Sequence, residues 1–251
     1  MGNLASKSNN YNDLHIITYN YNFAQESLYN NNILNNFINK FNDVNNIICI
    51  QGIRNNSFIY ENKNKNKNIN FIEDLGLLII TNLEIMKSHN VVFTSSNNKV
   101  LNNFNYGFQK LHINYLNIPF CIYNLELSPN SLDEISFNNI RESEILELIS
   151  FIYNNMNEDK IHIITGCFYD AEINFDELLN LSKINNIITN LKTCEQESYI
   201  FIYSNKLLNN LENFNNYLLN KFNIQVISHK LYNLDIGEHC PFETILRINK
   251  N

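Results

Sequence analysis

The stretch IHIITGCFYD spans residues 161–170 and contains the most informative turn of the chain. Its first five residues are rich in β-branched side chains, which predicts a buried strand that ends at Gly166. Many hydrolases place a catalytic acid at such a strand end, where chemistry is usually carried. Here the next residue is Cys167. The thiol belongs either to an unusual active site or to a former one.

Short apolar runs like this one recur along the chain and predict further strands. They cover residues 14–20, 47–50, 75–82, 85–93, 106–116, 118–127, 198–203, 224–230 and 242–248. Apolar residues at helical spacing predict helices over 25–41 and 139–156, and weaker patterns indicate helices over 174–185 and 206–221. Many strands with few helices, no internal repeat and only three prolines predict an α+β layered sandwich in one domain.

The composition limits the possible partners and compartments. The 251 residues are 44% hydrophobic, which is enough for one large core, and the formal charge is −7. This charge makes nucleic acid an unexpected partner, because any contact with a polyanion would have to be local. The chain is Asn-rich, and its five cysteines form no CxxC pair. With no apolar secretory segment at the start and no run of about 20 apolar residues, we expect an intracellular protein that does not span a membrane.

The first residues predict a lipid modification. MGNLASK matches the M-G-x-x-x-[ST] pattern for N-myristoylation, with Gly2 as the acceptor and Ser6 at the required position. A single acyl chain binds membranes only marginally, with a constant of about 10⁴ M⁻¹, so stable attachment needs a second signal. ENKNKNKNIN at 61–70 carries three lysines, but it is better interpreted as a solvated low-complexity loop. We expect the protein at the cytoplasmic face of a membrane, with the membrane surface and a protein as partners.

The ends of the predicted strands form a series that resembles a known family. In order, they are TYN (18–20), CIQGI (49–53), GLLIITN (76–82), YNLEL (123–127), ITGCFY (164–169), SYIF (198–201) and GEHCPF (237–242). The series resembles the endonuclease/exonuclease/phosphatase superfamily, which has the DNase I-like fold and includes metal-dependent nucleases, inositol phosphatases and neutral sphingomyelinases. The resemblance extends from about Leu14 to Ile248. It implies a four-layer αββα sandwich in a single domain over residues 14–251, after a flexible or acylated segment over 1–13.

The resemblance also implies a magnesium-dependent phosphoesterase site, and its first positions are altered in this chain. Asn20 matches an asparagine that assists metal binding. The metal-binding glutamate that should follow Gln51 is replaced by Gly52, which has no side-chain ligand. Glu126 takes the position of a Thr-His-Leu histidine that stabilises the phosphoryl transition state. An anion there would face a phosphate where the family has a hydrogen-bond donor.

The later positions of the implied site are altered as well. Cys167 and Tyr169 replace the two polar residues of a Gly-Asp-x-Asn segment, which orients water and substrate. Ser198 replaces an aspartate, and Glu238 replaces the acid of the final Asp-His pair, of which His239 is kept. Residues that serve turns and packing are retained: Gln51, Gly166, Phe168, Tyr199, Phe201 and Pro241. The pattern indicates a fold that has kept its scaffold and lost its chemistry, so we expect no cofactor.

Two other interpretations remain open. In the first, the protein is an active phosphodiesterase or phosphatase with a rebuilt site, in which Asn20, Asp170 and Glu238 hold Mg²⁺ or Mn²⁺, with Glu126 and Glu172 nearby. In the second, Cys167 is a nucleophile and His239 its base. A Cys/His/Glu zinc site belongs to the same group of alternatives. Neither a thiolate-activating group nor an oxyanion site is evident for thiol chemistry, and a buried cysteine is usually an inert apolar residue.

Overall fold

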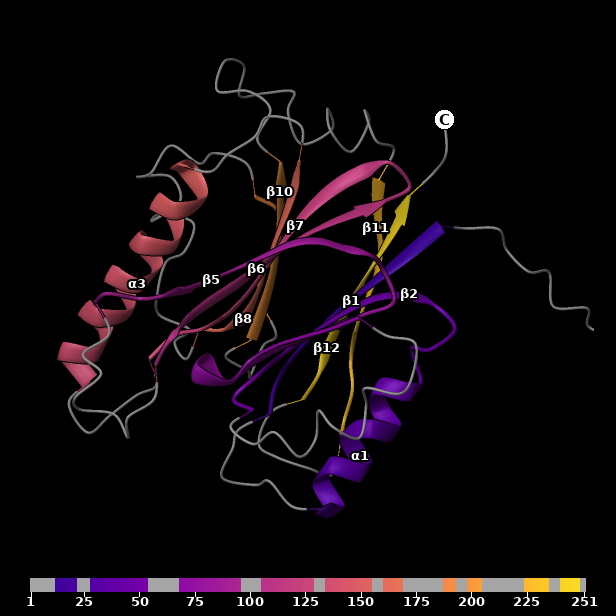
Figure 1. Ribbon diagram of the computed structural model, residues 1–251, viewed down its shortest axis with the longest axis horizontal. Coiled ribbons are helices and arrows are strands. Elements are labelled where there is room, and N and C mark those ends of the chain that lie inside the picture. The colour runs from indigo at the N-terminus through magenta and orange to yellow at the C-terminus, as the bar shows by residue number, and fades with distance from the viewer. Residues whose placement is uncertain are drawn as a thin grey trace, which may run out of the picture.

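Two six-stranded β-sheets packed face to face form the centre of the molecule (Figure 1). This is a computed structural model, and it describes residues 12–21, 28–53, 68–95, 105–128, 134–154, 160–168, 187–192, 198–204, 224–234 and 240–248. We call the sheets A and B. Sheet A has the order β11-β12-β1-β2-β4-β3, with β1 (Asn12–Asn20), β2 (Asn45–Gln51), β3 (Asn68–Ile72), β4 (Leu77–Thr81), β11 (Ile224–Leu231) and β12 (Phe242–Ile248).

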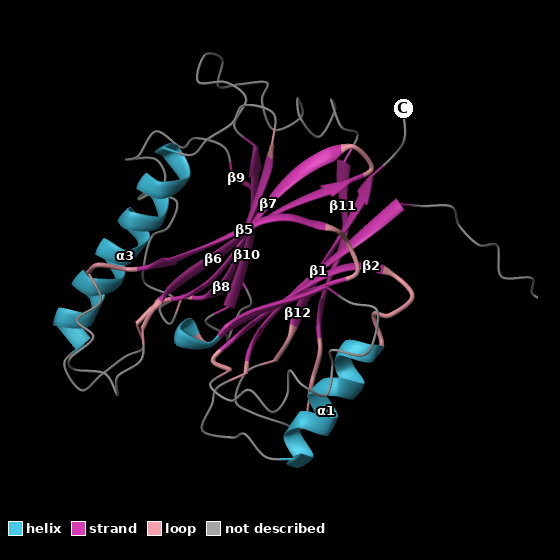
Figure 2. Cartoon of the chain, in the orientation of Figure 1, coloured by secondary structure: helices cyan, strands magenta, loops and turns pink. Residues whose placement is uncertain are grey.

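Sheet B has the order β5-β6-β7-β8-β10-β9. Its strands are β5 (Ile85–Val92), β6 (Gly107–Tyr115), β7 (Ile118–Glu126), β8 (Ile161–Cys167), β9 (Ile187–Lys192) and β10 (Ser198–Ser204). Helix α1 (Leu28–Asn39) covers the outer side of sheet A, and helix α3 (Glu134–Asn154) covers the outer side of sheet B (Figure 2). A short 3₁₀ turn, η2 (Glu73–Leu75), precedes β4. None of the described helices is long and apolar enough to cross a membrane.

The alternation of side chains along the strands explains the four layers. On β1, Leu14 and Ile16 point into the core between the sheets, whereas Ile17 and Tyr19 pack against α1. On β7, Ile122 points into the core between the sheets, whereas residues such as Tyr123 pack against α3. Each sheet therefore has two apolar faces, and a helix must cover the outer one. The predicted αββα sandwich is confirmed.

Most predicted elements form, with two strands missed. The loop predicted over 61–70 is wrong for its last three residues: they belong to β3, which forms because it pairs with β4 in an antiparallel ladder. β9 forms by pairing with β10. Both lie at sheet edges, where a single neighbouring strand supplies the pairing. The helices predicted over 174–185 and 206–221 lie outside the described residues.

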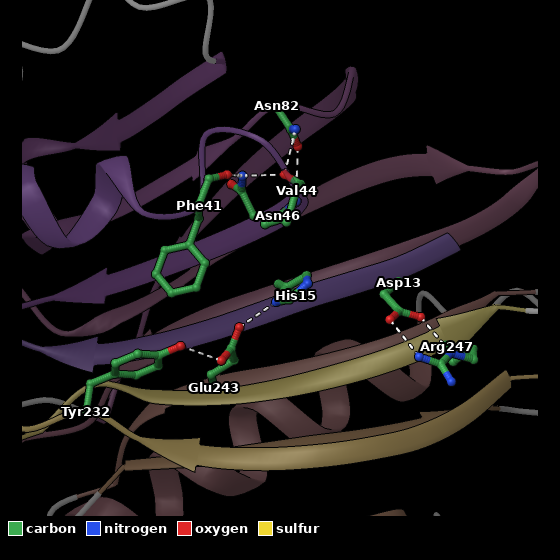
Figure 3. Close-up of polar contacts among 9 residues, drawn as sticks. All are labelled: Asp13, His15, Phe41, Val44, Asn46, Asn82, Tyr232, Glu243 and Arg247. Atoms are coloured by element: carbon green, nitrogen blue, oxygen red, sulfur yellow. Dashed lines mark hydrogen bonds and ion pairs between the residues drawn. The ribbon is translucent and has the colours of Figure 1, made fainter. Parts of the chain in front are cut away.

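The first and last strands of the described chain are neighbours in sheet A, joined by side chains as well as by backbone (Figure 3). On the outer face, His15 Nδ1 lies 2.5 Å from Glu243 Oε1, and the Tyr232 hydroxyl donates to Glu243 Oε2 over 2.6 Å. Arg247 Nε and Nη2 donate to the two carboxylate oxygens of Asp13 over 2.9 and 3.0 Å. Because Glu243 is almost fully buried, these contacts supply the hydrogen bonds that a buried carboxylate requires.

Candidate functional site

The inward-facing side chains of four central strands change from apolar to polar toward one end of the sandwich. Each column begins with core residues and finishes with polar ones or a thiol. The columns are Leu14-Ile16-Thr18-Asn20 on β1, Ile47-Cys49-Gln51 on β2, Phe120-Ile122-Asn124-Glu126 on β7 and Ile161-Ile163-Thr165-Cys167 on β8. We call this end of the sandwich the site end. Buried polar groups are retained at a cost, so their gathering at one end marks a candidate functional site.

Gln51 is held by hydrogen bonds between the two sheets. Its Nε2 donates to Asn124 Oδ1 over 2.6 Å and to Thr18 Oγ1 over 3.2 Å. Asn124 Nδ2 in turn donates to the carbonyl oxygens of Ile50 and Leu78, each over 3.2 Å. All three polar side chains of this network are fully buried. Their donors are used within the protein, so the network fixes the sheets in register and leaves little to offer a ligand.

Asn20 and Cys167 also meet between the sheets. Asn20 Nδ2 donates to Cys167 Sγ over 3.0 Å, and the two side chains are 2% and 0% exposed. Asn20 Oδ1 accepts no hydrogen bond from the described residues, although it is buried. The thiol therefore occupies the position beside Asn20 where the resemblance implies an aspartate. A substrate could reach this sulfur only if the site end opened, which argues against a nucleophilic role.

Two glycines shape the backbone at the site end. Gly52 follows β2 with φ = 76°, a left-handed conformation that glycine adopts without strain. Gly166 has φ = 149°, and a Cβ added there would lie 2.1 Å from the Leu125 carbonyl oxygen. A side chain is thus excluded at Gly166 by the close approach of β7. Its retention is explained by packing alone and does not indicate remaining chemistry.

The end of β7 is tied to α3. The Ser128 hydroxyl and backbone N–H donate to the Glu144 carboxylate over 2.5 and 2.9 Å. Arg141 Nη1 donates to the Ser128 carbonyl oxygen over 3.5 Å, and the arginine is 1% exposed. Arg141 and Glu144 thus hold the chain just after β7 against α3.

The histidine of the implied Thr-His-Leu motif is absent in either alignment of β7. We placed it at Glu126, which is 4% exposed and faces the other sheet. The motif can also be aligned with Tyr123-Asn124-Leu125, which places the amide of Asn124 at the histidine position. Asn124 and Glu126 lie on the same face of β7, so both alignments direct the side chain into the site end. In neither case does β7 provide an imidazole.

The structure places part of the expected site together. Asn20, Gly52, Glu126 and Cys167 all lie at the site end, and β10 pairs Ser198 with Cys167. The side chain of Ser198 is not described. Tyr169, Asp170, Glu172, Glu238 and His239, and the acceptor Gly2, lie outside the described residues. Their placement remains a prediction.

Thr18 and Asn124 are site residues that the sequence analysis did not single out. Both interrupt apolar strands at inward positions, at a spacing of two from core residues, and this alternation is the signal that identifies them. Their common partner Gln51 is 33 residues from Thr18 and 73 residues from Asn124 along the chain. Only the packing of the two sheets brings the three together.

The described residues do not fit a Mg²⁺ ion. Mg²⁺ requires oxygen ligands in near-octahedral geometry, usually with one or two carboxylates. The site end offers Asn20 Oδ1 and the carboxylate of Glu126, next to a thiol that is a poor ligand for this ion. Gly52 contributes no side chain. Within the described part of the chain, no group of three His, Cys, Asp or Glu residues could hold a metal ion.

Two six-stranded sheets that pack face to face, each covered on its outer side by a helix, define the DNase I-like fold. The polar side chains gather at one end of this sandwich. No protein-family model and no curated protein sequence matches the chain. Solved structures that match share this fold. A humanized D. rerio TDP2 with 14 mutations has a TM-score of 0.66 at 11% identity, covering 94% of this chain and 99% of its own.

Two further structures show the same fold. The beta toxin of Staphylococcus aureus, a mutant with bound magnesium ions, has a TM-score of 0.64 at 12% identity and covers 92% of this chain and 99% of its own. An endonuclease/exonuclease/phosphatase from Beutenbergia cavernae has a TM-score of 0.63 at 7% identity, with 94% and 72% covered. At these identities the likeness establishes the fold alone, and the chemistry must be argued from this chain's own residues.

Proposed function

We propose that this protein is a catalytically inactive protein of the DNase I-like fold, which acts as a membrane-peripheral binding or scaffold protein. The observation that carries the proposal is the contact between Asn20 and Cys167. A buried thiol fills the space beside the asparagine, and Gly52 supplies no carboxylate on the neighbouring strand. Mg²⁺-assisted phosphoryl transfer needs a hard oxygen ligand set and a positioned water. The described residues do not supply such a ligand set.

The proposed mode of attachment is an N-terminal myristoyl group on Gly2, supported by the MGNLASK sequence. The protein would then work at the cytoplasmic face of a membrane, where the preserved scaffold presents a surface to a protein partner. Mass spectrometry of the chain coexpressed with N-myristoyltransferase, compared with Gly2→Ala, measures the modification. A Gly2→Ala variant that stays on membranes as well as the unchanged protein does would eliminate myristate as the main anchor.

Catalytic inactivity is tested with a nitrophenyl phosphodiester in the presence of Mg²⁺ or Mn²⁺. We expect no turnover above that of the His239→Ala variant, which removes the retained imidazole of the implied Glu-His pair. Metal-dependent turnover that His239→Ala abolishes would overturn the proposal. Metal analysis of the purified protein is the companion measurement, and bound zinc would revive Cys167 as a ligand.

The alternative function is a phosphodiesterase or phosphatase with a rebuilt site. It is favoured by one observation, the buried Asn20 Oδ1 that accepts no hydrogen bond from the described residues. Such an oxygen suits a cation if carboxylates from Asp170 or Glu238 come close to it. The beta toxin of the same fold binds magnesium ions, which is consistent with a metal in this class of structure. Asp170→Asn and Glu238→Gln would each abolish the activity that this alternative requires.

A further inference from the structure

The outer face of sheet B carries a group of basic side chains away from the site end. We call it the Lys/His surface, and it consists of Lys87 and His89 on β5, Lys110 and His112 on β6, and Lys160 just before β8. The register pairs Lys87 with His112 and His89 with Lys110 on adjacent strands. Paired residues lie on one face of a sheet, so these four side chains share it. Lys160 Nζ reaches the same cluster, 3.3 Å from His112 Nδ1.

Lys110 is the most unusual member of the surface. It is only 3% exposed, and its ammonium lies 5.5 Å from the centre of the Tyr123 ring and 5.1 Å from that of Phe151. The rings stabilise the cation but do not neutralise it. Burial lowers the pKa of Lys110, and Lys160 and Lys87 lower it further. A lysine held in this way usually has an anionic partner.

The described charged groups that act on His112 are all basic. Burial, together with Lys160, Lys110, His89 and Lys87, lowers the pKa of His112 to about 4. Among the described residues, no carboxylate contributes to the pKa shifts of His112 or Lys110, and Cys121 is the one acidic group that acts on Lys110. The described part of this surface therefore gathers lysines without a carboxylate, although the formal charge of the chain is −7.

Protection of an edge strand is a structural role that explains one lysine of the Lys/His surface. A lysine on an edge strand such as β5 prevents pairing with other chains, which accounts for Lys87. Lys110 lies on the second strand of the sheet and Lys160 precedes the fourth, so edge protection does not explain them. Glu158 and Asp159 precede Lys160 in the sequence and lie outside the described residues. The three lysines converge on one region without an intramolecular anion among the described residues.

Lys87, His112 and Lys160 lie in the half of sheet B nearer the end of the sandwich where the described chain begins, whereas His89 and Lys110 lie two residues closer to the site end. Lys160 precedes β8, and β8 and β1 both finish at the site end, where Asn20 contacts Cys167. The start of β1 is therefore at the opposite end, beside the β6–β7 turn. Asn45 Nδ2 donates to the Tyr115 hydroxyl over 2.7 Å and joins the start of β2 to the end of β6 there. The first described residue, Asn12, thus lies at the same end as Lys160.

We propose that the Lys/His surface docks on the phosphate-bearing headgroups of an anionic membrane, with Lys87 and Lys160 as the contact charges and Lys110 buried beneath them. The proposal rests on the membrane attachment proposed above, because it supplies the second signal that a single acyl chain needs. Lysines near an anionic bilayer attract it electrostatically, and the attraction falls off within a Debye length. Two observations favour an anionic membrane as the ligand: the positive charge of the lysines, and their position toward the end of the sandwich where Asn12 lies.

The test uses the full-length, non-acylated chain and sedimentation with vesicles of phosphatidylcholine alone or mixed with phosphatidylserine. We expect binding only to the mixed vesicles, weakened about fivefold by each of Lys87→Gln and Lys160→Gln. Lys40→Gln is the matched control, because it removes an exposed lysine near the end of α1 and changes the net charge equally. Lys110→Met, which keeps an apolar stem between the rings, tests the buried lysine separately.

Four outcomes would overturn the proposal. They are equal binding to both kinds of vesicle, no binding to either, an equal loss with Lys40→Gln, and unchanged binding in the Lys87→Gln/Lys160→Gln double variant. Inorganic phosphate and a single-stranded oligonucleotide are titrated in parallel. If either binds with the same lysine dependence while vesicles do not, the surface serves that ligand and membrane docking is wrong. Because the chain is not acylated, these results are independent of the myristoylation and activity tests above.

Discussion

At the scale of the single residue, Gly52 combines two features. It removes the carboxylate that the family resemblance implies, and its φ of 76° gives the chain a conformation that other residues adopt only with strain. The backbone after β2 has therefore adapted to glycine. A glutamate placed here would therefore have to adopt a strained main-chain conformation.

We expect Gly52→Glu to lower the free energy of unfolding by about 1–2 kcal/mol, because a Cβ is disfavoured in the left-handed region. We also expect it to restore no phosphodiesterase activity. Urea unfolding followed by circular dichroism measures the first effect. Gly52→Ala is the matched control and should lose about as much, since the strain depends on the Cβ; Gly52→Asn should lose less. A stable Gly52→Glu protein would contradict the strained backbone.

The contact between Asn20 and Cys167 shows what could be predicted from the sequence at this scale. The thiol and the asparagine were singled out by position within a series of strand ends, and the structure brings them within 3.0 Å. The network around Gln51 was not anticipated, because Thr18 and Asn124 have no unusual neighbours in sequence. Their burial depends on which strands of the two sheets face one another. That pairing is a long-range property, which local spacing does not encode.

At the scale of the elements, β8 combines an inward face at the site end with an outward face of unusual chemistry. His162 points outward, is completely buried, and lies with its Nδ1 3.2 Å from the Tyr123 hydroxyl. Burial, together with Lys110, Lys160 and His112, lowers the pKa of His162 to about 3. The histidine is thus neutral in the folded protein over a range in which an exposed histidine takes up a proton.

This difference in proton binding makes the free energy of unfolding depend on pH. Between the ordinary pKa of 6.5 and the folded value of about 3, the unfolded chain binds a proton at His162 that the folded chain excludes. The contribution of the neutral His162 to the free energy of unfolding is therefore complete above pH 6.5 and is lost as the pH falls. From pH 7 to pH 4 we expect the free energy of unfolding to fall by about 3 kcal/mol through this residue.

Urea unfolding at several pH values, with His162→Gln as the test variant, measures the effect. We expect the variant to be less stable at pH 7 and to show a flatter decline toward pH 4. His89→Gln is the control, since it replaces the same residue type at an exposed position of β5. If the free energy of unfolding of the variant falls with pH as steeply as that of the unchanged protein, the buried imidazole does not control the loss of stability in acid.

The sequence predicted elements best where apolar residues alternated or recurred at helical spacing. The strands at 14–20, 118–127 and 242–248 correspond closely to β1, β7 and β12. β3 was missed because Asn68 and Asn70 continue the composition of the preceding loop. Its strand character comes from β4, and Gln109 Nε2 donates to Asn70 Oδ1 over 2.6 Å from the other sheet. Edge strands of this kind are specified by their partners more than by their own residues.

At the scale of the whole molecule, sheet A depends on its last strand in sequence, β12. β12 lies between β11 and β1, and its Glu243 and Arg247 form the contacts with His15 and Asp13. Without β12, β1 would become an edge strand and β11 would lose its described neighbour. The apolar side chains Leu246 and Ile248 would also leave the core between the sheets. The two ends of the chain therefore stabilise one another.

We expect a chain truncated after Pro241 to lose its cooperative unfolding transition and to collect in the insoluble fraction. The physical reason is that a central strand and its part of the core are removed together. Thermal unfolding of the soluble fraction measures the transition. Deletion of residues 249–251 is the control and should change the melting temperature little, because β12 ends at Ile248. A folded truncated protein would show that sheet A does not need its last strand.

The parallel course of β1 and β8 has a consequence for orientation at a bilayer. β1 has nine residues, so its ends lie about 26 Å apart, well beyond the headgroup layer of about 6 Å. A molecule that rests its Lys160 side on lipid holds Asn20 and Cys167 toward the cytosol. A lipid hydrolase needs its cleft to face the interface from which it takes its substrate. Under the proposed docking, a ligand of the site end would instead arrive from the water, so the ligand to look for is a soluble molecule or the projecting segment of another protein.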